Sequence, residues 1–144
     1  MACIFCGIVR GDAPASLVHA DESVLAFMNI RPTAPGECLV IPRAHVDHFT
    51  DLDDDTAARI MVVAQRIGRS LRRAFEPERV GFVVHGYGVS HAHLIVVPQH
   101  GPDDITSGQF AQLVDGRIAF SDRHLEVADR AVLDEHARRL AHGL

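Results

Sequence analysis

A chain of 144 residues, of which 47% are hydrophobic and 23% are charged, is long enough to form one globular domain around a single hydrophobic core. Its net charge of −5 gives no sign of the basic surface that nucleic-acid-binding proteins carry. The sequence has no run of about 18 apolar residues that could span a membrane, and no basic and hydrophobic leader of the secretory type, so we expect a cytoplasmic protein.

The first motif along the chain is a Cys-x-x-Cys pair, Cys3 and Cys6. Residues three apart in a helix or a turn lie on one face, so both sulfurs could reach one metal ion. The thiols could instead be small buried side chains, or a redox pair, although no strand precedes them as it would in a thioredoxin-like protein. The odd total of three cysteines argues against a disulfide framework. The pair indicates a metal site only if the chain supplies two further ligands.

Short apolar runs separated by turn residues predict three strands in the first part of the chain. Residues 17–19 and 24–28 form a predicted hairpin, because a polar four-residue turn separates them. Residues 29–36 contain two prolines and a glycine, which predict a loop. Residues 38–41 form the third predicted strand, which a proline ends.

Residues 54–75 are predicted to form a long amphipathic helix, because apolar residues recur there at steps of three and four. Acidic residues stand at the start of this segment and Arg72 and Arg73 at its end, as the helix dipole favours, and Pro77 prevents its continuation. The apolar residues that recur at these steps are Leu52, Ile60, Val63, Ile67 and Leu71, with Met61, Ala64 and Ala74 in support.

The second half of the chain is organised around residues 91–98, which read His-Ala-His-Leu-Ile-Val-Val-Pro. The aliphatic run predicts a central strand covered on both faces, which Pro98 ends. His91 and His93 stand two residues apart, so we expect both imidazoles to point to the same face of the strand. Two histidines in one pocket could hold a metal ion, carry out nucleophilic or acid–base chemistry, or divide these tasks. A purely structural role is less attractive for two histidines than for one, because four ring nitrogens would need partners.

Four weaker patterns surround this motif. A strand is predicted at 81–84, and the glycine-containing loop 85–90 that follows it is either a tight hairpin turn or a loop whose backbone amides approach an anion. A short strand at 116–121 and a helix at 127–142 are predicted in the last part of the chain.

Several of these motifs occur together, and in one order, in a known family. The chain resembles the histidine-triad (HIT) family of nucleotide hydrolases and transferases in five segments: Cys3-Ile4-Phe5-Cys6, Gly11-Asp12-Ala13-Pro14-Ala15-Ser16, Ala26-Phe27-Met28-Asn29-Ile30-Arg31-Pro32, Leu39-Val40-Ile41-Pro42-Arg43-Ala44-His45-Val46 and His91-Ala92-His93-Leu94-Ile95-Val96-Val97-Pro98. The resemblance covers about residues 3–100 and leaves a C-terminal extension at 101–144.

The resemblance implies an α+β fold in which residues 1–144 form a single HIT-like domain. Its sheet would be antiparallel with about five strands, next to one long helix and a C-terminal helix. It also implies a homodimer, for which Ile60, Met61 and Val62 offer apolar side chains on more than one face of the long helix. The expected partner is a nucleotide with a purine mononucleotide moiety, cleaved at its α-phosphate through a nucleotidyl-histidine intermediate. Neither nucleic acid nor a membrane is expected as a partner.

The resemblance assigns the roles of individual residues. His93 would be the nucleophile, with its ring oriented by the backbone carbonyl of His91. A structural zinc would be held by Cys3, Cys6, His45 and His91, which form a closed tetrahedral set of two thiolates and two imidazoles. The residues implied in nucleotide binding are Phe27, Asn29, Ile30, His85, Ser90, His91 and His93.

The chain also departs from the family pattern. The family motif is His-x-His-x-His, and Ile95 occupies its third position, where a histidine normally contacts phosphate and assists the leaving group. Asn29 replaces a usual aspartate and His85 a usual asparagine, and the loop before the motif is short. His85, Ser90 and His100 are the candidates to replace the missing phosphate contacts. The departures leave an alternative function open, a degenerate relative that binds a nucleotide or a partner without efficient catalysis.

Overall fold

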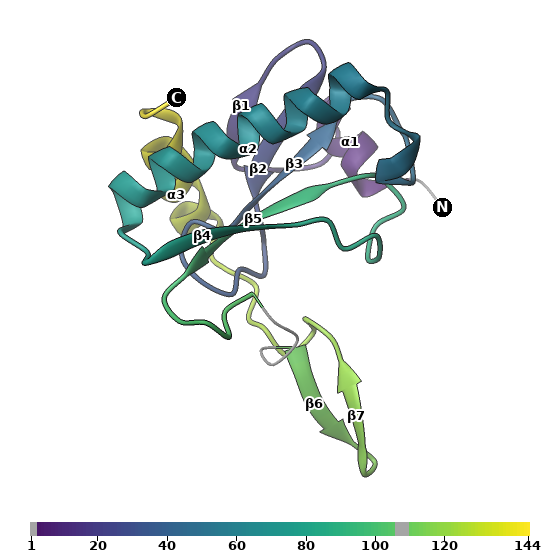
Figure 1. Ribbon diagram of the computed structural model, residues 1–144, viewed down its shortest axis with the longest axis vertical. Coiled ribbons are helices and arrows are strands. Elements are labelled where there is room, and N and C mark those ends of the chain that lie inside the picture. The colour runs from purple at the N-terminus through teal and green to yellow at the C-terminus, as the bar shows by residue number, and fades with distance from the viewer. Residues whose placement is uncertain (1–2, 106–109) are drawn as a thin grey trace.

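In the residues that the computed structural model describes, 3–105 and 110–144, five strands form an antiparallel sheet in the order β1-β2-β3-β5-β4 (Figure 1). A separate hairpin, β6–β7, and three α-helices complete the fold. The elements are α1 (Ile4–Arg10), β1 (Leu17–Ala20), β2 (Val24–Met28), β3 (Cys38–Pro42), η1 (Phe49–Asp51), α2 (Asp54–Phe75), β4 (Arg79–Val83), β5 (Leu94–Gln99), β6 (Ala111–Val114), β7 (Arg117–Phe120) and α3 (Arg130–Ala141). The expected α+β fold is therefore confirmed.

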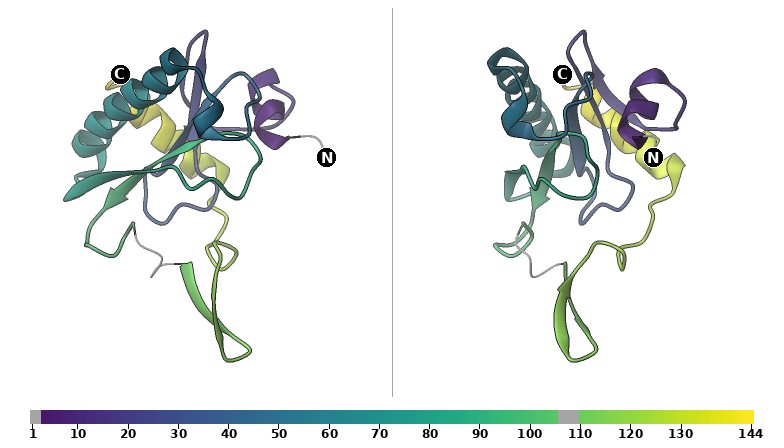
Figure 2. Two further views of the ribbon diagram at one scale, coloured as in Figure 1. Left: turned by 45° about the vertical axis from the view of Figure 1, so that its right-hand side comes forward. Right: turned by 90° about the vertical axis from the view of Figure 1, so that its right-hand side faces the viewer.

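Helices cover both faces of the five-stranded sheet, with α2 and α1 on opposite sides (Figure 2). Because side chains alternate along a strand, each strand contributes to both layers. Val24, Val40 and Leu94 belong to the larger core, which includes residues of α2 and α3. Leu25, Phe27, Leu39 and Ile41 pack with Phe5 of α1 in a smaller cluster on the other face. The central strands β2 and β3 are buried along their whole length, as their continuous apolar sequences predict.

Helix α2 has the predicted bounds of 54 and 75. The side chain of Asp53 caps its N-terminus by accepting a hydrogen bond of 2.8 Å from the Thr56 amide. The helix ends at Phe75, and Glu76, which follows it, has a left-handed φ of 51°. Of the apolar residues predicted for this helix, Ile60, Val63, Ile67 and Leu71 are fully buried in the larger core and Leu52 packs against it, whereas Met61 is 46% exposed. Within the described part of the chain, neither α2 nor another helix is long and apolar enough to cross a membrane.

The prediction that Pro98 ends its strand was wrong. Strand β5 begins at Leu94 and continues through Pro98, which lies opposite Val80 of β4, to Gln99. The proline is tolerated because β3 pairs with β5 only as far as Val96, so that Pro98 interrupts no ladder with β3. The strand also begins three residues after His91, so both motif histidines precede it.

The predicted strand at 116–121 is β7, and it pairs with β6, which the sequence analysis missed. Asp115 and Gly116 connect the two strands, both with positive φ, and an Asp-Gly pair between apolar residues is the usual signal for this hairpin turn. The hairpin projects from the sheet (Figure 1), and its apolar side chains are largely exposed, with 77% for Leu113 and 69% for Ile118. Helix α3 begins three residues later than predicted.

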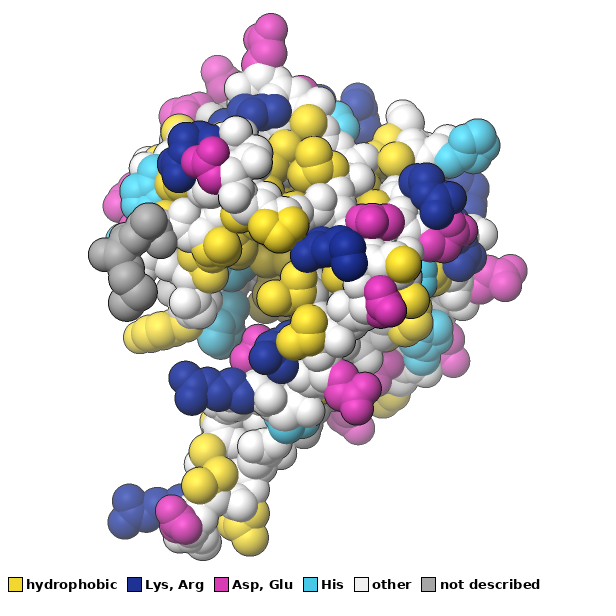
Figure 3. All heavy atoms as spheres, turned by 180° about the vertical axis from the view of Figure 1, so that it is seen from behind, with side chains coloured by type: hydrophobic (Ala, Val, Ile, Leu, Met, Phe, Trp, Pro, Cys, Tyr) yellow, Lys and Arg dark blue, Asp and Glu magenta, His cyan; other side chains and the backbone are white. Residues whose placement is uncertain are grey.

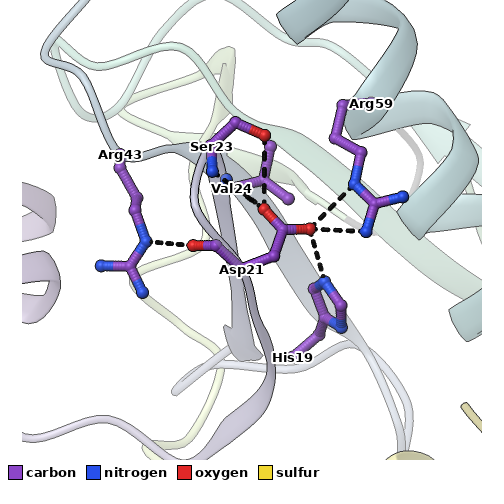
Figure 4. Close-up of polar contacts among 6 residues, drawn as sticks. All are labelled: His19, Asp21, Ser23, Val24, Arg43 and Arg59. Carbon is purple, nitrogen blue, oxygen red and sulfur yellow. Dashed lines mark hydrogen bonds and ion pairs between the residues drawn. The ribbon is translucent and has the colours of Figure 1, made fainter.

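Asp21 connects the β1–β2 turn to α2 (Figure 4). One carboxylate oxygen accepts hydrogen bonds of 2.9 Å from the amides of Ser23 and Val24. The other accepts from the His19 ring at 2.9 Å and from two nitrogens of Arg59 at 2.8 and 2.6 Å. Burial alone would raise the pKa of Asp21, but these hydrogen bonds outweigh it and hold the pKa well below its usual range.

This network predicts an acid-dependent stability. A carboxylate whose pKa is lowered on folding stabilises the protein above its unfolded pKa of about 3.9, and that contribution is lost as the pH falls through the lower folded pKa. We expect Asp21→Asn to lower the free energy of unfolding at pH 7 by about 2 kcal/mol, and the difference from wild type to shrink below about pH 4. Urea unfolding at pH 7, 5 and 3 measures this. Asp12→Asn is the control, because Asp12 is 64% exposed in its ion pair with Arg10 and should matter little. A constant difference across this pH range would contradict the prediction.

Candidate active site and metal centre

The two motif histidines lie immediately before β5, on the side of the sheet that α1 covers. The ring of Phe5 in α1 meets both imidazoles edge to face, with centroid distances of 5.8 Å to His91 and 5.6 Å to His93. Both side chains are buried, with exposed fractions of 0% and 7%. The spacing of two residues therefore places both rings on one face, as predicted, although β5 itself begins only at Leu94.

Four side chains from separate parts of the chain converge beside α1. Cys3 is the N-cap of α1 and Cys6 lies one turn later, while His45 follows β3 and His91 precedes β5. Their potential ligand atoms all lie within 4.8 Å of one another. Sγ of Cys3 is 3.5 Å from Nδ1 of His91, and Sγ of Cys6 is 3.3 Å from Nδ1 of His45 and 3.7 Å from Nδ1 of His91.

These distances fit a tetrahedral zinc ion. Zinc–sulfur and zinc–nitrogen bonds of usual length, held at the tetrahedral angle, separate sulfur from nitrogen by about 3.6 Å. Nε2 of His91 lies 2.9 Å from the carbonyl oxygen of Pro42, which fixes the proton on Nε2 and leaves the Nδ1 lone pair directed at the cysteines. Burial lowers the pKa of His91, so its ring is neutral, as a metal ligand must be. Burial and the adjacent Cys3 raise the pKa of the Cys6 thiol, an effect that a bound cation would reverse.

His93 is separate from this cluster of potential ligands. Its Nδ1 lies 2.8 Å from the carbonyl oxygen of His91, and the Nδ1–H donates to that oxygen, as the resemblance implies. The tautomer that makes this bond carries its lone pair on Nε2. Among the described residues, none hydrogen-bonds to that nitrogen. His93 therefore presents an unprotonated ring nitrogen whose direction is fixed through the opposite side of the ring.

Ile95 of β5 lies two residues beyond His93 and on the same side of the sheet. It pairs with Leu39 of β3, which in turn pairs with Phe27 of β2, so these three side chains form one row across the sheet. Ile95 packs against the smaller cluster. Its hydrocarbon side chain can neither donate a proton nor contact phosphate by a hydrogen bond. Figure 3 shows hydrophobic side chains gathered on this face of the molecule, which is turned away from α2.

The other residues implied in nucleotide binding are more dispersed. Asn29 directly follows β2, and Ile30 beside it is 48% exposed. The C-terminal segment lies against this loop, because the Ala128 amide donates to the Ile30 carbonyl at 2.8 Å. His85 and Ser90 are exposed in the β4–β5 loop, where the His85 ring contacts Tyr87. In the described part of the chain, neither side chain hydrogen-bonds to His93, and neither does exposed His100.

Two residues of this face were missed by the sequence analysis. Phe5 packs on both histidines and also on Phe27, at a centroid distance of 5.3 Å. Glu37 is a buried acid that hydrogen-bonds to Asn29. The signal for Glu37 was its position immediately before the apolar strand β3, where an acidic side chain needs partners if it is buried.

Comparison with known proteins identifies the class to which this fold and site belong. The family model described as "HIT domain" matches residues 10–102, so the chain belongs to the HIT family. It is 35% identical to "Protein hit" of Bacillus subtilis over 107 residues, covering 71% of this chain and 74% of that protein. It is 33% identical to an adenosine 5′-monophosphoramidase of Schizosaccharomyces pombe over 105 residues, covering 69% and 75% of the two chains.

Solved structures extend the likeness to the C-terminal part of the chain. The crystal structure of a Zn-bound histidine triad family protein from Mycobacterium smegmatis is similar to this structure with a TM-score of 0.76 and 31% identity. The match covers 99% of this chain and 93% of that one. The shared architecture therefore extends beyond the residues that the family model matches.

Proposed function

We propose that this protein is a nucleotide hydrolase or transferase of the HIT type that acts at the α-phosphate of a nucleoside monophosphate derivative, with His93 as its nucleophile. The observation that carries the proposal is the 2.8 Å hydrogen bond from His93 Nδ1 to the His91 carbonyl, which leaves the Nε2 lone pair available on the face that α1 covers. A histidine held in this way presents a lone pair of fixed direction, as a nucleophile needs. The neighbouring cluster already offers Nδ1 of His91 and Nδ1 of His45 as metal ligands.

The proposed reaction has two steps. His93 Nε2 attacks the α-phosphorus, a phosphorus–nitrogen bond forms, and the bond to the leaving group breaks with its electron pair. Water then attacks the nucleotidyl-histidine, which releases the nucleoside monophosphate and restores the ring. Because Ile95 offers no proton, an amine leaving group takes its proton from solvent.

The proposed substrate is a phosphoramidate or a dinucleoside polyphosphate with a purine mononucleotide moiety. The similarity to an adenosine 5′-monophosphoramidase supports the phosphoramidate class. Phe27, Ile30 and Asn29 would meet the nucleoside, and the phosphate would lie next to His93. His85 and Ser90 are the remaining residues that we assign to the binding of the nucleotide, whereas the fully buried His91 ring serves the proposed metal site. We expect the protein to act in the cytoplasm.

Turnover of adenosine 5′-phosphoramidate by wild type and by His93→Ala tests this function. We expect wild type to release ammonia and AMP. The variant should lose this activity, because it lacks the ring nitrogen that we propose as the nucleophile. His48→Ala is the control, since His48 is exposed and lies outside the site. Equal activity of wild type and His93→Ala would contradict the assignment of the nucleophile.

The alternative, a relative that binds nucleotides without efficient catalysis, is favoured by one observation, the hydrocarbon side chain at position 95 beside His93. It predicts AMP binding by both proteins, detectable by calorimetry, without turnover of the phosphoramidate by either.

We also propose that Cys3, Cys6, His45 and His91 hold one zinc ion with a structural role. The sulfur–nitrogen distances of 3.3–3.7 Å, the neutral His91 ring and the Zn-bound relative support this assignment. When bound, zinc would join α1 to the segments after β3 and before β5. Its ligand set is closed, so it leaves no position for a substrate.

We further propose a homodimer that includes the surface of α2 and β4. Met61 and Val62 on α2 are 46% and 41% exposed, and Phe82 on β4 is 38% exposed. Strand β4 is at the edge of the sheet as described, where a strand of a second copy could pair with it. Ile60 does not contribute, contrary to the expectation from sequence, because it is fully buried in the core.

Val62→Glu is expected to convert this dimer to a monomer, because it places a charge in an apolar interface. Light scattering at micromolar concentration measures the mass. Val132→Glu on α3 is the control, since Val132 is 47% exposed on another helix. A wild-type chain that is already monomeric under these conditions would contradict the proposed dimer.

A further inference from the structure

Glu37 is a buried acid whose oxygens are both occupied by donors. It is only 3% exposed, and it immediately precedes β3. One oxygen accepts from Asn29 Nδ2 at 2.5 Å, and the other accepts from the amide and the hydroxyl of Thr33 at 3.0 and 2.5 Å. No described basic side chain forms an ion pair with it. The carboxylate is therefore held by neutral donors alone, and three separate groups depend on its being an acceptor.

These contacts determine how the Asn29 amide is oriented. A carboxylate can only accept, so the NH₂ group of Asn29 must face Glu37. The Arg31 amide can only donate, and it lies 3.0 Å from Oδ1 of Asn29, so the carbonyl must face Arg31. The contacts with Glu37 and with the Arg31 amide therefore require the same orientation of the Asn29 amide and exclude the flipped one. Asn29 is partly exposed, so its second N–H and the second lone pair of Oδ1 are left for a ligand.

The position of Asn29 directs these groups to the proposed nucleotide face. It stands two residues beyond Phe27, and the ladder continues to it, because its amide donates to the Glu37 carbonyl at 3.0 Å. By strand alternation it lies on the same face as Phe27, which packs against Phe5 beside His93. One donor and one acceptor on a single amide complement a vicinal diol.

We propose that Glu37 is a positioning residue for sugar recognition, which holds the Asn29 amide so that it selects a ribose over a deoxyribose; this inference rests on the proposed nucleotide-binding function. The pair acts as one unit, in which the buried charge is on Glu37 and the ligand contact is made by Asn29. Without Glu37, the NH₂ group of Asn29 loses its buried acceptor, and only the Arg31 amide still favours this orientation.

If Glu37 and Asn29 act together, two single substitutions should each be harmful and their combination should be tolerated. In Glu37→Gln, the new NH₂ group faces a donor whichever way it turns, either Asn29 Nδ2 or the Thr33 amide. In Asn29→Asp, which places the residue usual in the family, two carboxylates face each other across a contact of 2.5 Å. The double variant satisfies every group, because the glutamine introduced at position 37 can donate to the aspartate introduced at position 29 while its own carbonyl accepts from Thr33.

Calorimetric titration with AMP and with 2′-deoxy-AMP tests this inference on the full chain. We expect wild type to prefer AMP by about three- to tenfold, the value of one or two hydrogen bonds. Glu37→Gln and Asn29→Asp should each bring the ratio close to one, and the double variant should recover a preference for AMP. Thr33→Val is the matched control: it removes one donor to Glu37 but keeps the Asn29–Glu37 bond, so it should lose stability without losing the preference.

The outcomes separate this inference from the proposed function. Wild type that binds neither nucleotide would overturn both. Wild type that binds the two nucleotides equally, or Glu37→Gln that keeps the wild-type ratio, would overturn the role of Glu37 alone. If Glu37→Gln does not fold by circular dichroism, the double variant decides, because all its groups are matched; a folded double variant without a preference for AMP would overturn the inference.

Discussion

Replacing Cys6 with serine is expected to remove the zinc and to lower the melting temperature by about 10 °C or more. Sγ of Cys6 approaches Nδ1 of both His45 and His91, so its loss removes the sulfur ligand that lies next to both imidazoles of the proposed site. A serine hydroxyl stays protonated near neutral pH and does not replace a thiolate as a zinc ligand. The metal would join segments that are 39 and 85 residues apart in sequence, which makes its contribution to folding large.

Metal analysis and thermal unfolding, each with and without a chelator, measure this effect. The chelator should lower the melting temperature of wild type to near that of Cys6→Ser and leave the variant unchanged. Cys38→Ala is the matched control, because Cys38 is a fully buried thiol outside the ligand cluster. It should lose some stability through the cavity but keep its zinc and its response to the chelator. Less than about 0.2 zinc per wild-type chain, after purification without chelator, would contradict the proposal.

The parts of the fold that were predicted correctly depend on local patterns. The bounds of α2 follow from its apolar periodicity, the cap at Asp53 and the proline at position 77, all of which act within a few residues. Strands β2 and β3 are apolar throughout, so their burial on both faces could be read directly from the sequence. The convergence of Cys3, Cys6, His45 and His91 could not be derived in this way, and it was expected only because the motifs resemble those of a family.

The parts that were missed depend on contacts distant in sequence. Pro98 remains in β5 because β3 does not pair with that end of the strand, which no property of the proline itself reveals. Asn29 could be identified as a departure from the family pattern, but its effect depends on Glu37, which is eight residues away and meets it across two paired strands. A substitution that removes a charge at one position can therefore be compensated by a charge at its neighbour in the ladder.

The activity of this protein is expected to rise steeply as the pKa of the leaving group falls. In-line attack by His93 requires stabilisation of charge on the phosphate oxygens and, for a basic leaving group, a proton. A general acid contributes about 10²–10⁴-fold where it is present, and Ile95 occupies the position where the family has a third histidine. Substrates with alkylamine leaving groups should therefore react slowly. Substrates with aryl or pyrophosphate-like leaving groups need little protonation, so their rates should be close to those expected with a histidine at position 95.

Ile95→His should restore the missing donor two residues beyond His93, on the same side of the sheet. We expect it to raise turnover of the alkylamine substrates more than that of the aryl substrates, and so to flatten the dependence on leaving-group pKa.

Because Ile95 is partly buried against the smaller cluster, the polar ring should also lower the free energy of unfolding by about 1–3 kcal/mol. Ile95→Val is the control, since it keeps a hydrocarbon at this position and should preserve the steep dependence. Single-turnover rates on a series of leaving groups measure both effects. A flat dependence in wild type, together with no gain from Ile95→His, would indicate that another residue such as His85 or His100 supplies the proton, or that His93 does not act on phosphorus.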